Sequence, residues 1–119
     1  MFSVDFYGLQ GYTGRKTTRR LHRLRHFVFF TYQPGFLTSE IIQELRDGFA
    51  LIQRDVEGVK EVRIETNVVD RPANMDLMIE MILADVSVLD EYLTHPEHVR
   101  LGKKMNPFIT HRVSFDCPV

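Results

Sequence analysis

The middle of the chain contains two stretches, residues 59–69 and 75–84, whose side chains alternate between apolar and more polar types. The more apolar face of the first stretch consists of Val62, Ile64, Thr66 and Val68. The second stretch presents on one face Met75, Leu77, Ile79, Met81 and Leu83. A period of two residues is the period of a β-strand. Because strands that follow each other in sequence usually pair, the stretches predict a central β-hairpin with its turn at residues 70–74, in a mixed or antiparallel sheet.

A strand and a long helix are expected before this hairpin. Residues 26–32 are rich in aromatic and β-branched side chains, which is typical of a buried strand. One apolar stripe follows, and its residues recur at the steps of four and three that are typical of a helix. It consists of Ile41, Leu45, Phe49, Ile52 and Val56. Thr38 or Ser39 can cap the start of the helix by accepting a bond from a backbone N–H group. Gly58 is expected to supply a left-handed turn at its end.

Two short helices and a last strand are expected after the hairpin. The first helix runs through Tyr92, and Pro96 begins a second helix that continues toward Met105. Residues 109–117 form the last predicted strand. The resulting order, βαββαβ, predicts an α+β, ferredoxin-like sheet with its helices on one face.

The opposite sheet face is expected to be apolar and uncovered. It would carry Phe27 or Val28, Phe29 and much of the strand over residues 75–84. An uncovered apolar face of this kind predicts a partner. A two-fold homodimer with its sheets face to face would bury it, and Phe29, Met78 and Ile82 could also line a pocket for a small hydrophobic ligand.

The charge is distributed unevenly. Residues 1–25 contain six basic residues and one acidic residue, whereas residues 26–119 contain nine basic and 15 acidic residues. We assign residues 1–24 to a basic N-terminal extension outside the core, and residues 25–119 to the folded domain. The extension can be read as an arm for nucleic acid or an anionic membrane, as a transit peptide, or as a solvated tail that follows an upstream start codon. We favour the tail, because charge runs are usually solvated, and we do not expect nucleic-acid binding.

Composition excludes several classes of protein. The single cysteine, Cys117, rules out an internal disulfide and a cysteine-based zinc site within one chain. The longest apolar runs are far shorter than the ~18 residues that a membrane span needs, so no membrane contact is expected. A cytoplasmic location fits a chain with one cysteine. Glycine-rich nucleotide loops and serine-hydrolase motifs are absent from the sequence.

Several segments of the chain resemble those of a known family. They are the opening strand from His26 to Phe30, the junction from Val56 to Val59, the Tyr-x-x-His-Pro-x-His segment from Tyr92 to His98, and the strand from Val113 to Asp116. On these segments the chain is identified as a member of the stress-responsive α/β-barrel (Dabb) domain family over about residues 25–117. Glu57 stands where this family usually has proline. The resemblance implies a homodimeric α+β barrel with a ferredoxin-like fold, and it does not fix one activity.

The same resemblance implies candidate catalytic residues. One branch is similar to plant polyketide cyclases, in which a tyrosine and a histidine drive an aldol cyclisation without a cofactor. By motif position these residues are Tyr92 and His98, with His26 on the same pocket wall. Related barrels include monooxygenases that act on aromatic substrates.

In the catalytic interpretation, His98 removes a proton next to a carbonyl group and the Tyr92 hydroxyl stabilises the oxyanion. Six residues of continuous helix turn by about 600°, so both side chains reach one cavity only if the helix breaks at Pro96. In the alternative interpretation, Tyr92 packs on the sheet and His98 makes a local hydrogen bond. The protein is then a non-catalytic stress-response or ligand-binding dimer.

No metal or cofactor is predicted. His26 and His98 could bind a metal only together with scattered carboxylates such as Asp76, Glu80 or Asp116. The sequence contains no tight metal-binding spacing such as His-Glu-x-x-His.

Overall fold

The two alternating stretches form neighbouring antiparallel strands in the computed structural model, which describes residues 22–119. The predicted basic extension therefore lies almost wholly outside the described residues. The four strands are β1 (Leu24–Tyr32), β2 (Val59–Thr66), β3 (Leu77–Leu83) and β4 (Ile109–Pro118). They form one sheet in the order β2-β3-β1-β4, and each neighbouring pair is antiparallel.

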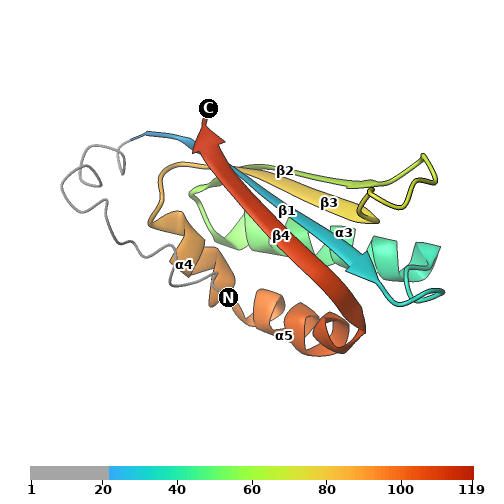
Figure 1. The fold of residues 1–119 in the computed structure, drawn as a ribbon. Helices are drawn as coiled ribbons and strands as arrows, with labels where there is room; N and C mark the ends of the chain where they lie inside the picture. The colour runs from blue at the N-terminus through green and yellow to red at the C-terminus, as the bar shows by residue number, and fades with distance from the viewer. Residues whose placement is uncertain (1–21) are drawn as a thin grey trace.

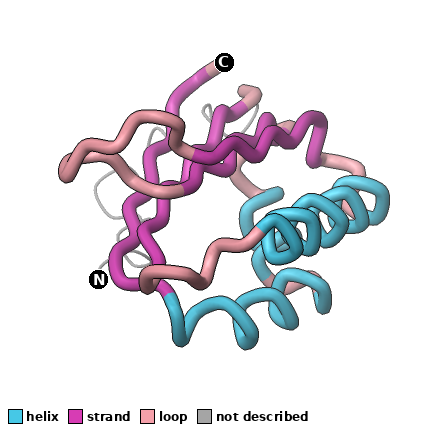
Figure 2. Tube along the Cα trace, turned by 90° about the vertical axis from the view of Figure 1, so that its right-hand side faces the viewer, coloured by secondary structure: helices cyan, strands magenta, loops and turns pink. Residues whose placement is uncertain are grey.

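The helices of the described part all cover the same face of this sheet (Figure 1). They are α3 (Ser39–Asp55), α4 (Val88–Leu93) and α5 (Pro96–Met105), followed by a 3-10 turn at Asn106–Phe108. Figure 2 shows the helices gathered on one side of the strands, which leaves the other face of the sheet uncovered by helix. The predicted α+β, ferredoxin-like plan is confirmed.

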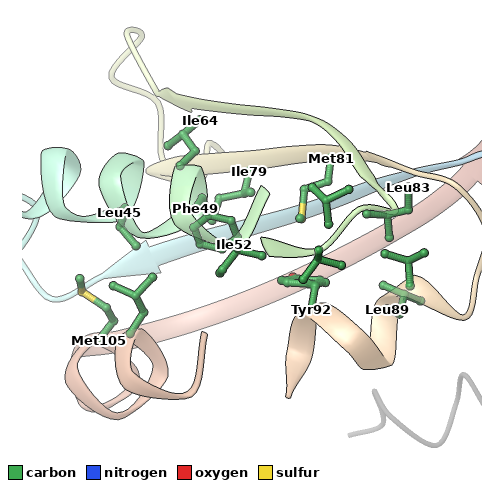
Figure 3. Close-up of a cluster of buried hydrophobic side chains, with 14 of the residues drawn as sticks. Leu45, Phe49, Ile52, Ile64, Ile79, Met81, Leu83, Leu89, Tyr92 and Met105 are labelled. Atoms are coloured by element: carbon green, nitrogen blue, oxygen red, sulfur yellow. The ribbon is translucent and has the colours of Figure 1, made fainter. Parts of the chain in front are cut away.

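The hydrophobic core lies between the three helices and the sheet (Figure 3). Its largest fully buried side chains are Ile52, Leu77, Met81 and Leu83. The last three alternate along β3, so the period of two in the sequence predicted their shared face correctly. The strand predicted over residues 59–69 is shorter than expected, because β2 ends at Thr66 and the side chain of Val68 is 90% exposed.

The two ends of α3 follow different rules. Thr38 caps the start as predicted, because its hydroxyl accepts a hydrogen bond from the backbone N–H of Ile41 at 3.2 Å. The prediction for Gly58 is wrong. Among the described glycines only Gly35 has a positive φ angle, and Val56 ends the helix with an extended backbone. Gly58 is instead a point of close packing, since a Cβ atom there would lie 2.4 Å from Cγ2 of Val88.

Replacing Gly58 with alanine is expected to destabilise the fold by about 1–3 kcal/mol, the usual range for overpacking. The contact is severe because Val88 is β-branched and buried, so its side chain has little freedom to move away. Gly102→Ala is the matched control. A Cβ atom at Gly102, inside α5, meets only an ordinary contact at 3.5 Å, so alanine there should stabilise the helix slightly. Urea unfolding of both variants measures the difference, and equal stabilities would contradict the packing argument.

The helix-free face of the sheet carries an aromatic cluster. Paired residues of neighbouring strands share a face, and Phe27 pairs with Phe115 while Phe29 pairs with Val113. The Phe27 ring lies 6.0 Å from the Phe29 ring and 6.5 Å from the Phe115 ring, measured between centroids. Phe115 is 60% exposed. We call Phe27, Phe29, Val113 and Phe115 the aromatic patch.

An ion-pair network lies beside the aromatic patch on the same face. Arg25 Nη1 donates to Glu80 Oε2 at 2.5 Å, and Arg63 Nη2 donates to Glu80 Oε1 at 2.6 Å. The hydrogen bonds from these two guanidinium groups hold the pKa of Glu80 below its ordinary value. Glu80 is therefore a paired carboxylate of the sheet face.

Candidate functional site

His26 lies on β1 at the helix-covered side of the sheet, where only 3% of its surface is exposed. The pairing of β1 with β4 places Asp116 directly opposite, and Asp116 Oδ1 lies 2.5 Å from His26 Nδ1. A carboxylate can only accept a hydrogen bond, so Nδ1 of His26 carries the hydrogen. Nε2 of the neutral ring is then an acceptor that points away from Asp116.

Tyr92 lies on the buried side of α4 and projects from that helix into the core (Figure 3). Only 3% of its surface is exposed. Its hydroxyl oxygen is 3.4 Å from His26 Nε2, which is a long hydrogen bond. Given the His26 tautomer, the Tyr92 hydroxyl is the donor in this bond. The Phe49 ring of α3 lies 6.1 Å from the Tyr92 ring and closes the apolar side.

His98 lies in the first turn of α5, on the other side of the predicted helix break. α4 ends at Leu93 and α5 begins at Pro96, so the break expected from the sequence is confirmed. It brings the His98 ring to 4.9 Å from the Tyr92 ring, nearly perpendicular at 80°. His98 also makes the local bond that the structural interpretation expects, because its Nδ1 lies 3.1 Å from the backbone oxygen of Leu93.

His95 fixes the start of α5. It is not part of the site cluster, which consists of His26, Tyr92, His98 and Asp116. Its Nδ1 accepts a hydrogen bond from the backbone N–H of Glu97 at 3.0 Å. Its Nε2 lies 2.9 Å from Asp55 Oδ2, at the end of α3. His95 therefore caps α5 and ties it to α3, and this holds His98 in place.

The electrostatic surroundings keep His98 neutral. Burial is the main cause that lowers the pKa of His98 below its ordinary value of 6.5, and the charge of Arg112 acts in the same direction. The bond to the Leu93 carbonyl opposes this shift without reversing it. Because a carbonyl oxygen only accepts, Nδ1 of neutral His98 carries the hydrogen and Nε2 carries the lone pair of a base.

A shallow surface hollow of about 600 Å³ opens beside His98. It is lined by His98, Val99, Gly102, Lys103, Asn106 and Pro107. His26 and Tyr92 do not line it. A small molecule that enters from this side therefore meets His98 before the other two residues.

Of the carboxylates considered for a metal site, only Asp116 lies in this cluster. Asp76 accepts a hydrogen bond from the backbone N–H of Tyr32, and Glu80 lies on the opposite sheet face. Within residues 22–119, no three His, Cys, Asp or Glu side chains are grouped to hold a metal ion. From the sequence, Asp116 was one of three scattered candidate metal ligands, and its hydrogen bond to His26 was not predicted. The β1–β4 register, which the motif does not contain, is what pairs the two residues.

Residues 24–119 match the sequence model of the Dabb family, described as the stress responsive A/B barrel domain. The chain belongs to the Dabb family. Comparison with curated protein sequences gave no match. In the described part of the chain, no helix is long and apolar enough to cross a membrane.

Solved structures with the same fold include three informative neighbours. A Dabb family protein from Mesorhizobium loti is 21% identical, with a TM-score of 0.63 over 81% of this chain and 95% of the other. A dimeric ferredoxin-like protein of unknown function from Thermobifida fusca is 15% identical, with a TM-score of 0.69 over 82% and 92%. The hydroxynitrile lyase from Passiflora edulis is 18% identical, with a TM-score of 0.66 over 83% and 94%. At these low sequence identities, the structural similarity shows that the fold is shared.

Proposed function

We propose that this Dabb protein is a homodimer that catalyses proton transfer at a carbon atom next to a carbonyl group in a small, partly hydrophobic compound. The observation that carries the proposal is the unbroken series of contacts from Asp116 through His26 and Tyr92 to His98. The four titratable groups come from four elements, and two of them, His26 and Tyr92, are buried. Such a gathering of titratable groups is typical of acid/base sites.

The tautomers assign a role to each side chain. Neutral His98 accepts the substrate proton on Nε2 and becomes an imidazolium, while the electron pair of the broken C–H bond moves onto the carbonyl oxygen. The Tyr92 hydroxyl has one hydrogen, which in the resting protein is donated to His26 Nε2. This hydrogen turns to the substrate oxygen as negative charge develops there. His26 and Asp116 do not touch the substrate. They hold the tyrosine hydroxyl in place and stabilise its orientation.

The neighbours support both parts of the proposal. Two of them, from Thermobifida fusca and Bacteroides fragilis, are described as dimeric proteins of ferredoxin-like fold. The Passiflora edulis neighbour is a lyase, which shows that this fold can carry an enzyme active on small organic molecules. The exposed aromatic patch on the helix-free sheet face supports the homodimer independently.

A non-catalytic dimer is the second candidate function. The burial of His26 and Tyr92, each only 3% exposed, favours it, because a substrate must displace packed side chains to reach the tyrosine hydroxyl. In this case the same hydrogen bonds satisfy polar groups in the core.

Replacing Tyr92 with phenylalanine tests the catalytic role, because it removes only the hydroxyl. The assay is deuterium incorporation from D₂O next to the carbonyl of aromatic ketones and β-keto acids, followed by NMR. We expect the rate with Tyr92→Phe to fall by about 10²-fold, the usual cost of losing one oxyanion donor. Tyr32→Phe is the control. Tyr32 is also buried on the helix-covered side of the sheet, but it lies outside the cluster. If the wild-type protein exchanges no hydrogen with any compound, the non-catalytic function is favoured. If both variants lose activity equally, Tyr92 is not the oxyanion donor.

A further inference from the structure

We infer that Arg112 makes the hollow beside His98 a binding site for a carboxylate, so that the compound on which the protein acts is a carbonyl compound that also carries an acid group. The inference rests on the proposed function, because it uses the same site. It adds the class of substrate, which neither the family nor the fold specifies.

Arg112 lies on the same side of β4 as Asp116. In the β1–β4 register Arg112 pairs with Phe30 and Asp116 pairs with His26, and these partners both face the helices. Four residues of strand separate the two, about 13 Å at the usual rise. β4 therefore places the Asp116 carboxylate against His26 and the Arg112 guanidinium group farther along the same face of the sheet.

Two contacts hold the guanidinium group without neutralising it. Arg112 Nη2 donates to Asn106 Oδ1 at 2.9 Å, and Asn106 lines the hollow together with His98. The guanidinium carbon also lies 5.3 Å from the centroid of the Phe30 ring. Within the described part of the chain, Arg112 takes part in none of the ion pairs, unlike Arg100, which binds Glu44 and Glu97. Arg112 is thus fixed in position, and no carboxylate among the described residues forms an ion pair with it.

The hollow itself is positive, in a domain where acidic residues outnumber basic ones. Lys103 lines it, and no carboxylate is among its lining residues. The charge of Arg112 also acts on His98, where it favours the neutral base. Arg112 itself does not line the hollow, but its hydrogen bond to Asn106 holds it next to a lining residue. An anion that reaches past Asn106 would therefore meet the Arg112 cation, with the proton acceptor of His98 in the same hollow.

A carboxylate fits this arrangement better than a neutral group. The planar guanidinium fork matches the two oxygens of a carboxylate, and Asn106 occupies only one of its donor nitrogens. Val99 and Pro107 add apolar surface for the rest of the molecule.

Benzoate is the probe that tests this inference, with benzamide as its neutral analogue of the same shape. NMR titration of the full-length protein follows the His98 ring and the Asn106 side-chain amide. We expect benzoate to shift both resonances and Arg112→Gln to weaken its binding about tenfold. Benzamide should bind the wild type as weakly as benzoate binds Arg112→Gln. The exposed Arg71 provides the control, and Arg71→Gln should leave benzoate binding unchanged.

Three results would overturn the inference: no shift at His98, equal affinity for benzoate in Arg112→Gln and the wild type, or phosphate binding at Arg112 as tightly as benzoate. A melting curve for each variant shows whether the fold is intact, and the exposed position of Arg112 predicts that it is. The measurement needs no turnover. A protein that binds benzoate through Arg112 but exchanges no hydrogen would refute the catalytic proposal alone, and an active protein that ignores benzoate would refute the carboxylate site alone.

Discussion

Replacing Phe115 with glutamate is expected to convert the proposed dimer into monomers at micromolar concentration. Phe115 is 60% exposed and forms the outer edge of the aromatic patch with Phe27, Phe29 and Val113. A two-fold dimer through this face would bury the new carboxylate in each protomer against apolar side chains, without a partner. A buried, unpaired charge costs several kcal/mol, so the dissociation constant should rise about 10³-fold or more.

The substitution separates assembly from folding. In one chain the Phe115 side chain lies mostly in solvent, so glutamate there should leave the monomer folded. Sedimentation velocity gives the mass in solution, and circular dichroism reports the fold. Val68→Glu is the control, because Val68 is exposed beyond the end of β2 and outside the aromatic patch. A dimer that survives Phe115→Glu would show that the copies associate through another surface.

The ion-pair network explains why an aromatic residue is the better target than a charged one. Glu80 is already paired with Arg25 and Arg63 within its own chain. Its replacement would leave two arginines unpaired and would disturb the sheet as well as the interface. Phe115 carries no charge and lies mostly in solvent in one chain, so its substitution tests only the association of two copies.

The fold was predictable from the sequence because its signals are local. The period of two in β3 gave the buried face that contains Leu77, Met81 and Leu83. Gly58 was assigned the wrong role because its constraint comes from a residue far away in the sequence. The contact with Val88 arises only when the start of α4 packs against the turn between α3 and β2. Local propensity favours a glycine for a left-handed turn, and only the packing shows that here the glycine makes room for a side chain.

The candidate site was predictable only in part. The sequence motif gave Tyr92 and His98, and the break at Pro96 explained how they meet. Asp116 and Arg112 are brought to the site by the register between β1 and β4, which joins residues 90 positions apart in the case of His26 and Asp116. No local pattern in the chain contains that register.

Replacing His98 with glutamine is expected to reduce deuterium exchange next to the carbonyl by about 10²- to 10⁴-fold, the usual contribution of a general base. Glutamine keeps much of the side-chain volume and can still donate a hydrogen bond toward the backbone oxygen of Leu93. It has no basic nitrogen to accept the substrate proton. His111→Gln is the control, because His111 is an exposed histidine on β4 outside the cluster.

The pH profile of the same reaction distinguishes a base from a structural histidine. Burial, together with the charge of Arg112, lowers the pKa of His98 below 6.5. The basic form therefore predominates at pH 7, and the rate should fall as the pH drops through this lowered pKa and Nε2 becomes protonated. In His98→Gln that step should disappear while residual exchange continues. If the variant keeps the step, another group is the base. If it unfolds at a much lower temperature and loses exchange only in proportion to the unfolded fraction, His98 serves the packing of α5 and the site is structural.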